Sequence, residues 1–134
     1  MKTAVFAISV ALVAGCAGTP DTPAELQAVR DYVDVGELEQ ADMIRTHGSD
    51  KWSPATNYYA LYESRDGWYL LEFTTICREM TDNTRITPDR RYDRNVMRRR
   101  IDTLRGCRID KMYPLTEAQA QEIEALVEGA DSGN

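Results

Sequence analysis

The segment from Tyr58 to Thr75 constrains the fold more strongly than any other part of the sequence. Two runs rich in aromatic and branched side chains, 58–64 and 68–75, flank the tripeptide Arg65-Asp66-Gly67. An Asp-Gly pair between such runs predicts a β-hairpin, because glycine adopts the positive φ of a tight turn without strain. The parity of the pairing is the same for a loop of two or four residues. The face expected to be core then carries Tyr58, Ala60, Tyr62, Tyr69, Leu71 and Phe73.

The other face of this hairpin mixes apolar and acidic side chains, so we expect it to be only partly covered. It carries Leu61, Trp68 and Leu70 beside Glu63 and Glu72. The aromatic cluster as a whole fits the core of a small sheet better than a ring-stacking platform for carbohydrate. Within it, Tyr59 and Trp68 are the aromatic pair that we expect to be more exposed.

Residues 98–112 fit either a helix or a second hairpin. A helix would place Val96, Met97, Ile101 and Leu104 on one stripe. A hairpin with the three-residue loop Leu104-Arg105-Gly106 gives four facing pairs: Ile101 with Ile109, Thr103 with Cys107, Asp102 with Arg108 and Arg100 with Asp110. Because this register pairs apolar with apolar and charge with opposite charge, we favour the hairpin.

Helix patterns stand on both sides of these strands. Thr22-Pro23-Ala24-Glu25 offers a threonine N-cap, a proline at the first helical position and a capping box, before a helix to about Tyr32. A second capping box, Thr116 to Gln119, precedes an apolar stripe of Ala120, Ile123, Leu126 and Val127. With a further strand expected at 42–46, the sequence predicts an α+β fold. We expect a mostly antiparallel β-sheet curled toward a small barrel or sandwich, with a short N-terminal helix and a C-terminal helix.

The N-terminal residues have the pattern of a targeting segment. Lys2 gives a positive start, and the apolar run 4–13 is far shorter than the ~20 residues of a membrane span. Val13-Ala14-Gly15-Cys16 resembles the lipobox of bacterial lipoproteins. The resemblance implies that residues 1–15 are a signal peptide and that Cys16 is lipidated and acylated. An ordinary secretory signal, with Cys16 near the cut by chance, is the alternative.

A lipid anchor on Cys16 would decide the location of the protein. One acyl chain binds a membrane only marginally, whereas two or three chains on one cysteine hold a protein almost permanently. Ala17 stands where an aspartate would be the familiar inner-membrane retention signal, so the resemblance implies the outer membrane, facing the periplasm. Residues 16–23 form a small, polar, proline-punctuated tether, which spans at most about 23 Å at ~3.3 Å per residue.

The rest of the chain has the size of a single domain. Residues 24–128 suffice for one α+β domain and are too few for two, and 129–134 have the composition of a flexible tail. A hydrophobic content of 43% and a charged content of 28% exclude a wholly disordered chain. The formal net charge of -6 argues against a nucleic-acid partner, since such proteins normally carry a basic surplus.

Two cysteines remain once Cys16 is assigned to lipid. In an oxidising compartment, Cys77 and Cys107 most simply form a disulfide. The alternative is a redox or metal pair, but the chain has no C-x-x-C spacing and His47 is its single histidine. The sequence therefore indicates no metal and no cofactor.

Charge is segregated along the chain. Between Arg85 and Lys111 lie ten basic and four acidic residues, so the rest of the chain is strongly acidic. Arginine's planar donor fork suits phosphate and carboxylate. The candidate anion-binding residues are Arg90, Arg91, Arg94, Arg98 and Arg99. Their expected partners are anionic lipid, lipopolysaccharide or an acidic protein, and internal pairing with carboxylates is the competing explanation.

Three patterns together resemble a family of small Gram-negative lipoproteins classed as a domain of unknown function. They are Cys77, the segment Cys107-Arg108-Ile109-Asp110, and the helix start Leu115-Thr116-Glu117-Ala118-Gln119. The resemblance covers roughly Val29 to Val127. It implies a Cys77–Cys107 pairing and a compact β-rich domain, and it implies no reaction.

The function classes follow from these features. We expect a non-enzymatic binding or structural accessory module of the cell envelope that takes an anionic partner. An inhibitor of a basic envelope-degrading enzyme, presenting the acidic part of the chain on a protruding loop, is the second hypothesis. A hydrolase built around His47 is the third, although nothing in the sequence places Ser49 or Ser53 as more than loop residues beside the imidazole.

Overall fold

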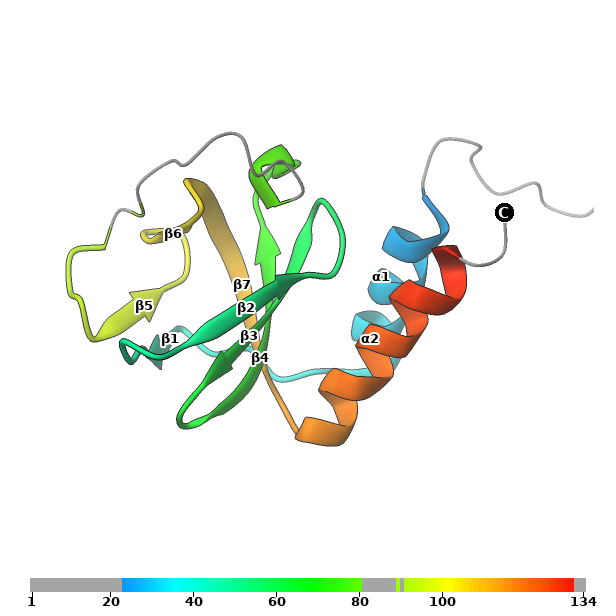
Figure 1. Ribbon diagram of the computed structural model, residues 1–134, viewed down its shortest axis with the longest axis horizontal. Coiled ribbons are helices and arrows are strands. Elements are labelled where there is room, and N and C mark those ends of the chain that lie inside the picture. The colour runs from blue at the N-terminus through cyan, green and yellow to red at the C-terminus, as the bar shows by residue number, and fades with distance from the viewer. Residues whose placement is uncertain (1–22, 81–88, 90, 132–134) are drawn as a thin grey trace, which may run out of the picture.

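An antiparallel sheet of five strands, in the order β2-β3-β4-β7-β6, forms the centre of the fold. It is seen in a computed structural model that describes residues 23–80, 89 and 91–131 (Figure 1). The large sheet consists of β2 (Lys51–Pro54), β3 (Tyr59–Ser64), β4 (Gly67–Phe73), β6 (Thr103–Leu104) and β7 (Cys107–Leu115). A second sheet pairs β1 (Met43–Arg45) with β5 (Val96–Arg98), also antiparallel. A 3₁₀ turn, η1 (Arg78–Met80), follows β4.

Two helices cover one face of the large sheet. Helix α1 (Ala24–Gly36) and helix α2 (Glu117–Asp131) lie side by side, on the opposite side of the large sheet from β1 and β5 (Figure 1). The sheet curls around its other face, and the small β1–β5 sheet lies against that side (Figure 1). The expected α+β class, with curled antiparallel sheet and a helix near each end, is confirmed.

The first hairpin forms as the Asp-Gly pair predicts. Ser64 pairs with Gly67, which leaves a two-residue loop, and Tyr62 faces Tyr69. The strand at 42–46 is also found, as β1. Strand β2, which pairs Trp52 with Tyr62, was not expected, because its four residues are too few to set an alternating pattern.

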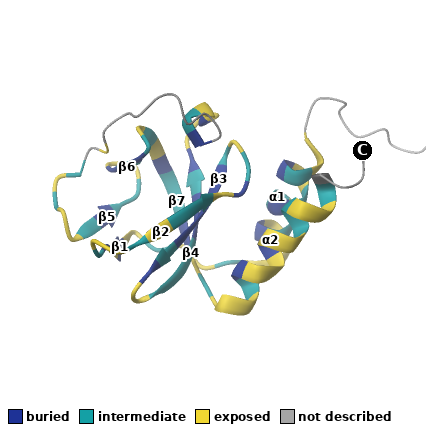
Figure 2. Cartoon of the chain, in the orientation of Figure 1, coloured by how far each residue is buried: buried dark blue, intermediate teal, exposed yellow. Residues whose placement is uncertain are grey.

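Each face of the large sheet has its own core (Figure 2). The inner core, on the curled side, contains Ile44, Ala60, Tyr62, Leu71, Phe73, Cys77, Met80, Met97, Leu104, Ile109 and Met112. The helix-side core contains Leu26, Val29, Val33, Ala55, Tyr59, Leu61, Leu70, Tyr113, Ala120 and Ile123. On this second face α1 and α2 bury Leu61 and Leu70, whereas Glu63, Trp68 and Glu72 are only half-buried, so the face is partly covered, as expected. Tyr58, just before β3, packs at the margin of the helix-side core and not in the inner one.

A β-bulge in β7 decides which side chains reach the inner core. Glu72 pairs with Lys111, but the next residue, Phe73, pairs with Ile109, so Asp110 has no partner on β4. The extra residue reverses the alternation of side chains along the strand. Ile109 and Met112, three positions apart, consequently both lie in the inner core.

The second hairpin is present, but its expected register is off by one residue. Thr103 pairs with Arg108 and Leu104 with Cys107, around the two-residue turn Arg105-Gly106. Both turn residues have positive φ, 54° and 81°, as a type I′ turn requires. Ile101 is half exposed, whereas Ile109 is buried in the inner core. Of the expected charge pairs, Arg100 with Asp110 forms, at 3.2 Å.

The two helices differ in how they begin. Helix α2 has the expected capping box: Gln119 N donates to Thr116 Oγ1, and Thr116 N donates to Gln119 Oε1. Helix α1 begins at Ala24 with Pro23 as its N-cap residue and has no side-chain cap, so proline is not at the first helical position as expected. Both helices are longer than expected, reaching Gly36 and Asp131. Residues 1–22, with Cys16, lie outside the described residues.

Candidate functional site

The structure separates the candidate anion-binding arginines into paired and unpaired ones. Arg99 Nε donates to Asp42 Oδ1 at 2.6 Å, and Arg91 lies 3.8 Å from Asp89. Arg90 lies outside the described residues. Arg94 and Arg98 remain, and within the described ranges no carboxylate lies at ion-pairing distance from either guanidinium. The five residues therefore do not act as one group.

Pairing of β1 with β5 brings a further arginine to the two that remain. Ile44 pairs with Met97, and both point into the inner core. Because side chains alternate along a strand, Met43 and Arg45 on β1 lie on the outer face together with Val96 and Arg98 on β5. Arg45 is exposed and, like Arg94 and Arg98, has no carboxylate partner among the described residues. We give the name arginine face to Met43, Arg45 and Arg98 on this outer face, together with the exposed Arg94 in the turn that precedes β5.

The sequence alone gave no sign of Arg45, since it lies 49 positions before Arg94. A hydrogen bond holds the two segments together: Thr46 Oγ1 donates to the carbonyl oxygen of Arg94 at 2.9 Å. Thr46 N also donates to the carbonyl oxygen of Asn95. These bonds fix the backbone on which Arg45 and Arg94 stand.

Apolar side chains are exposed on and near the arginine face. Met43 is 60% exposed and Tyr92, two residues before Arg94, is 88% exposed. Ile101, three residues after Arg98, is 48% exposed. An exposed surface with both guanidinium groups and large apolar side chains is typical of an interaction site.

Asp102 anchors the turn that follows β5. It is fully buried, and its Oδ2 accepts a hydrogen bond from Arg98 N at 2.6 Å. Its backbone N–H donates to the carbonyl oxygen of Arg98, and its own carbonyl oxygen accepts from Ile109 N. The expected pairing of Asp102 with Arg108 is therefore wrong: Asp102 caps the turn from inside, and Arg108 is exposed.

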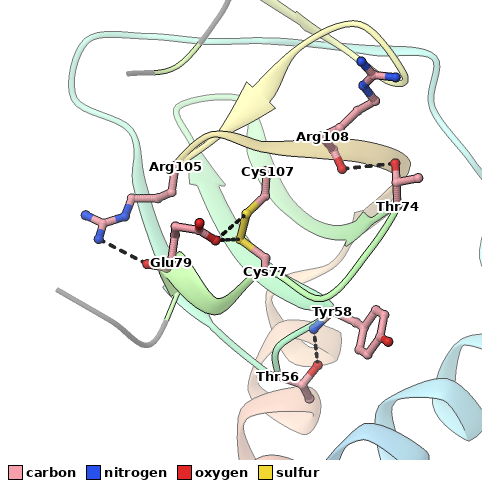
Figure 3. The surroundings of a disulfide bond; sticks show 8 residues. All are labelled: Thr56, Tyr58, Thr74, Cys77, Glu79, Arg105, Cys107 and Arg108. Atoms are coloured by element: carbon pink, nitrogen blue, oxygen red, sulfur yellow. Dashed lines mark hydrogen bonds between the residues drawn. A yellow bond between two sulfur atoms is a disulfide. The ribbon is translucent and has the colours of Figure 1, made fainter. Parts of the chain in front are cut away.

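The disulfide between Cys77 and Cys107 is present, with Cα atoms 5.8 Å apart. Glu79 Oε2 lies 3.4 Å from Cys107 Sγ and 3.9 Å from Cys77 Sγ (Figure 3). Disulfide sulfurs carry no proton, so these are polar contacts and not hydrogen bonds. The two Sγ atoms and one carboxylate oxygen of Glu79 are of the kinds that can bind a metal ion, and they lie within 4.8 Å of one another. However, thiolate is the form of cysteine that binds metal, and both sulfurs are used in the S–S bond.

Arg105 links this disulfide region to β2. Its Nη2 donates to the carbonyl oxygen of Glu79 (Figure 3). Its guanidinium lies 5.4 Å from the ring centroid of Trp52. Met80, at the end of η1, is buried in the inner core. The disulfide therefore closes one end of the inner core together with η1 and the β6–β7 turn.

His47 lies in the loop between β1 and β2 and pairs with a carboxylate. Its Nε2 is 3.2 Å from Asp66 Oδ2, and its backbone N–H donates to Asp50 Oδ2. Asp50 also accepts from the Tyr62 hydroxyl at 2.6 Å, so the loop is tied to β3. Among the described residues no serine hydroxyl contacts the ring, so no Ser-His pair is seen there.

Tyr59 and Trp68 do not form the expected exposed pair. Tyr59 is only 3% exposed, and Trp68 is half-buried against the helix-side core. Burial, then the negative charge of Glu72, raises the pKa of Tyr59 to about 12. The aromatic cluster belongs to the two cores, as expected for most of its members.

Within the part of the chain that the structure describes, no helix is both long and apolar enough to cross a bilayer. No curated protein and no solved structure matches the chain. The sequence does match DUF6491, a family of unknown function, over residues 1–130. Because this match covers nearly the whole chain and agrees with the expected kinship to a domain of unknown function, the protein belongs to the DUF6491 family.

Proposed function

We propose that this protein is a lipid-anchored, non-enzymatic binding module of the bacterial cell envelope, held at the outer membrane on the periplasmic side. We further propose that the arginine face binds phosphate groups of anionic membrane lipid. The anchor rests on the lipobox pattern at Val13-Ala14-Gly15-Cys16 and on the short tether that follows it.

The proposal that the arginine face binds lipid phosphate rests on one observation, the lack of carboxylate partners for its guanidinium groups within the described residues. Arg45, Arg94 and Arg98 stand together with no carboxylate partner among the described residues, although the chain as a whole is acidic. Each arginine near an anionic lipid surface contributes about 1 kcal/mol. Three of them supply about 3 kcal/mol, enough to orient a domain that an anchor already holds at the membrane.

The shape of the molecule agrees with two points of attachment. Helix α1, to which the tether leads, lies on the other side of the sheet from β1 and β5 (Figure 1). An anchor at one end and the arginine face at the other would lay the long axis of the domain along the bilayer. The exposed Met43 and Tyr92 would then sit at the interface, where amphipathic side chains are favoured.

Nothing specific favours the other two hypotheses. The inhibitor hypothesis requires a protruding acidic loop, whereas many exposed carboxylates stand on α1 and α2, such as Asp34, Glu117 and Glu124. A Ser-His-Asp hydrolase needs a hydroxyl at the ring nitrogen of His47 that does not face Asp66, and among the described residues no hydroxyl is hydrogen-bonded to the ring.

The test uses the lipidated protein in vesicles, with an environment-sensitive dye attached to Met43→Cys. We expect the dye to report an apolar environment in vesicles that contain phosphatidylglycerol, but not in vesicles of phosphatidylcholine alone. Arg45→Ser together with Arg98→Ser should lower the equilibrium constant for contact between the arginine face and the anionic vesicle about 25-fold, because each arginine contributes about 1 kcal/mol. Lipopolysaccharide in place of phosphatidylglycerol distinguishes the two sources of phosphate.

Two controls make the result specific. Lys51→Ser removes one positive charge from β2, where the Lys51 side chain is 79% exposed, and should leave the response unchanged, whereas Arg45→Ser alone should already weaken it. The dye at Gln121→Cys, on the exposed side of α2, should not respond to anionic lipid. A Met43 dye that behaves alike in anionic and neutral vesicles would rule out lipid phosphate as the partner.

A further inference from the structure

A pocket of about 660 Å³ lies at the end of the molecule where the described chain begins. The first turns of α1, the last turns of α2 and the loop between β2 and β3 surround it, and Ile76 closes it from the segment after β4. This volume is in the range of small-molecule sites. None of the residues of the arginine face lines it, so the pocket is a separate feature.

The pocket wall combines an apolar surface with charged groups of both signs. Leu26, Ile76 and Val127 are among its apolar residues, and Ile76 is 48% exposed. Glu25 and Arg30 on α1 and Glu128 on α2 contribute the charged groups, two acidic and one basic. An apolar surface with a few polar groups is the usual composition of a site for a small amphipathic molecule.

Arg30 is held in place before any ligand arrives. Its guanidinium lies 5.3 Å from the ring centroid of Tyr58, which also lines the pocket. The Tyr59 hydroxyl interacts with it as well. A guanidinium has five N–H donors, so these contacts leave donors for an oxyanion. Because Arg30 is already positioned, a phosphate would bind it at a smaller entropic cost.

The opposite wall is also rigid. Ala55 N and Thr56 N both donate to the carbonyl oxygen of Tyr59, and Tyr58 N donates to Thr56 Oγ1. Cys77 N donates to the carbonyl oxygen of Asn57 at 2.7 Å, which ties this loop to the disulfide. Figure 3 shows Thr56 and Tyr58 between the disulfide and the two helices. The pocket is thus preformed by connected elements.

We propose that this pocket binds a single-chain phospholipid with a zwitterionic head group. The phosphate contacts Arg30, the ammonium group contacts Glu25, and the acyl chain packs on Leu26, Ile76 and Val127. Pro23, on the pocket rim, is seven residues from Cys16, so the pocket lies at most about 23 Å from the proposed anchor. A molecule released from the same bilayer is therefore within reach.

The experiment titrates lysophosphatidylethanolamine, below its micelle concentration, into the full-length chain in its unlipidated Cys16→Ser form. Calorimetry gives the affinity. Arg30→Gln should weaken binding tenfold or more, since hydrogen bonds to charged groups are strong. Ile76→Ala should weaken it about fivefold through lost apolar contact. Arg108→Gln and Val35→Ala, which remove an exposed arginine and an exposed aliphatic side chain outside the pocket, should change nothing.

The head group is tested separately with two further probes. Lysophosphatidylglycerol has the phosphate without the ammonium group, and monoacylglycerol has neither. We expect affinity to fall in that order, and Glu25→Gln to remove the preference for the ethanolamine head. Equal binding of all three, or equal affinity in Arg30→Gln and Arg108→Gln, would overturn the proposal. Neither result bears on the arginine face, whose variants are Arg45→Ser and Arg98→Ser.

Discussion

The carboxylate of Glu72 contacts several polar side chains between the sheet and the helices. Lys111 Nζ lies 3.2 Å from its Oε1, and the Tyr113 hydroxyl donates to its Oε2 at 3.0 Å. Tyr59 interacts with the same carboxylate. Burial, followed by the hydrogen bond to Glu72, also raises the pKa of Tyr113 above its usual range. Both tyrosines therefore stay protonated in the folded protein at pH values where a solvated tyrosine ionises.

This network predicts a loss of stability in alkali. The pKa of Tyr59 is raised to about 12 in the fold, against about 10 in the unfolded chain. The stabilisation is complete below pH 10 and is lost as the pH rises through 12, because only the unfolded chain can release the proton early. Urea unfolding at several pH values should show the free energy of unfolding falling above about pH 10.

The variant Tyr59→Phe isolates the tyrosine contribution. The variant keeps Lys111 and its contact with Glu72, so the two proteins differ at the tyrosine hydroxyl alone. We expect the variant to show a shallower fall of stability between about pH 10 and 12 than the wild type. Identical slopes for the two proteins would mean that Tyr59 ionises normally in the fold.

At the scale of single elements, the β6–β7 turn shows how backbone conformation selects a residue. Gly106 has φ 81°, in the left-handed region. An alanine there would cost about 1–2 kcal/mol, part of which is offset by the lower entropy of the unfolded chain. We expect Gly106→Ala to lower the free energy of unfolding by about 1 kcal/mol, measured by chemical denaturation.

A second glycine provides the control. A Cβ at Gly48 would meet no atom within 4 Å, and Gly48 has no positive φ. Gly48→Ala should therefore leave stability unchanged or raise it by about 0.5 kcal/mol. If both substitutions cost the same, the turn conformation is not what makes Gly106 necessary.

The elements that could be predicted from the sequence are those specified by local chemistry. The Asp66-Gly67 pair predicts the first hairpin, and Thr116 with Gln119 predicts the start of α2, because both signals act within a few residues. The register of the second hairpin could not be predicted. Arg105 occupies a left-handed position that arginine rarely takes, so its residue type gives no local signal for the two-residue turn.

The other features that could not be predicted from the sequence depend on pairing between strands that are far apart in the chain. The bulge at Asp110 depends on how β7 meets β4, and no local pattern in β7 records it. Arg45 joins Arg94 and Arg98 only because β1 pairs with β5 across a long stretch of chain. The candidate site was therefore predicted in part: two of its arginines, but neither its boundary nor the strand that completes it.

For the molecule as a whole, the disulfide links both cores. Cys77 and Cys107 lie at the edge of the inner core, and Cys77 N bonds to Asn57 in the loop beside the helix-side core. Strands β3, β4 and β7 contribute side chains to both cores. Because the cores share these strands, neither can unfold while the other stays intact, and one cooperative transition is expected.

Removing the disulfide should accordingly destabilise the entire fold. In a Cys16→Ser background, which prevents mispairing, Cys77→Ser with Cys107→Ser should lower the free energy of unfolding by about 3 to 4 kcal/mol. The reason is the entropy that the crosslink, at a sequence separation of 30, removes from the unfolded chain. Denaturation followed by tryptophan fluorescence and by circular dichroism should give coincident transitions. A loss below about 1 kcal/mol would contradict the crosslink argument, and two separate transitions would show that the shared strands do not couple the cores.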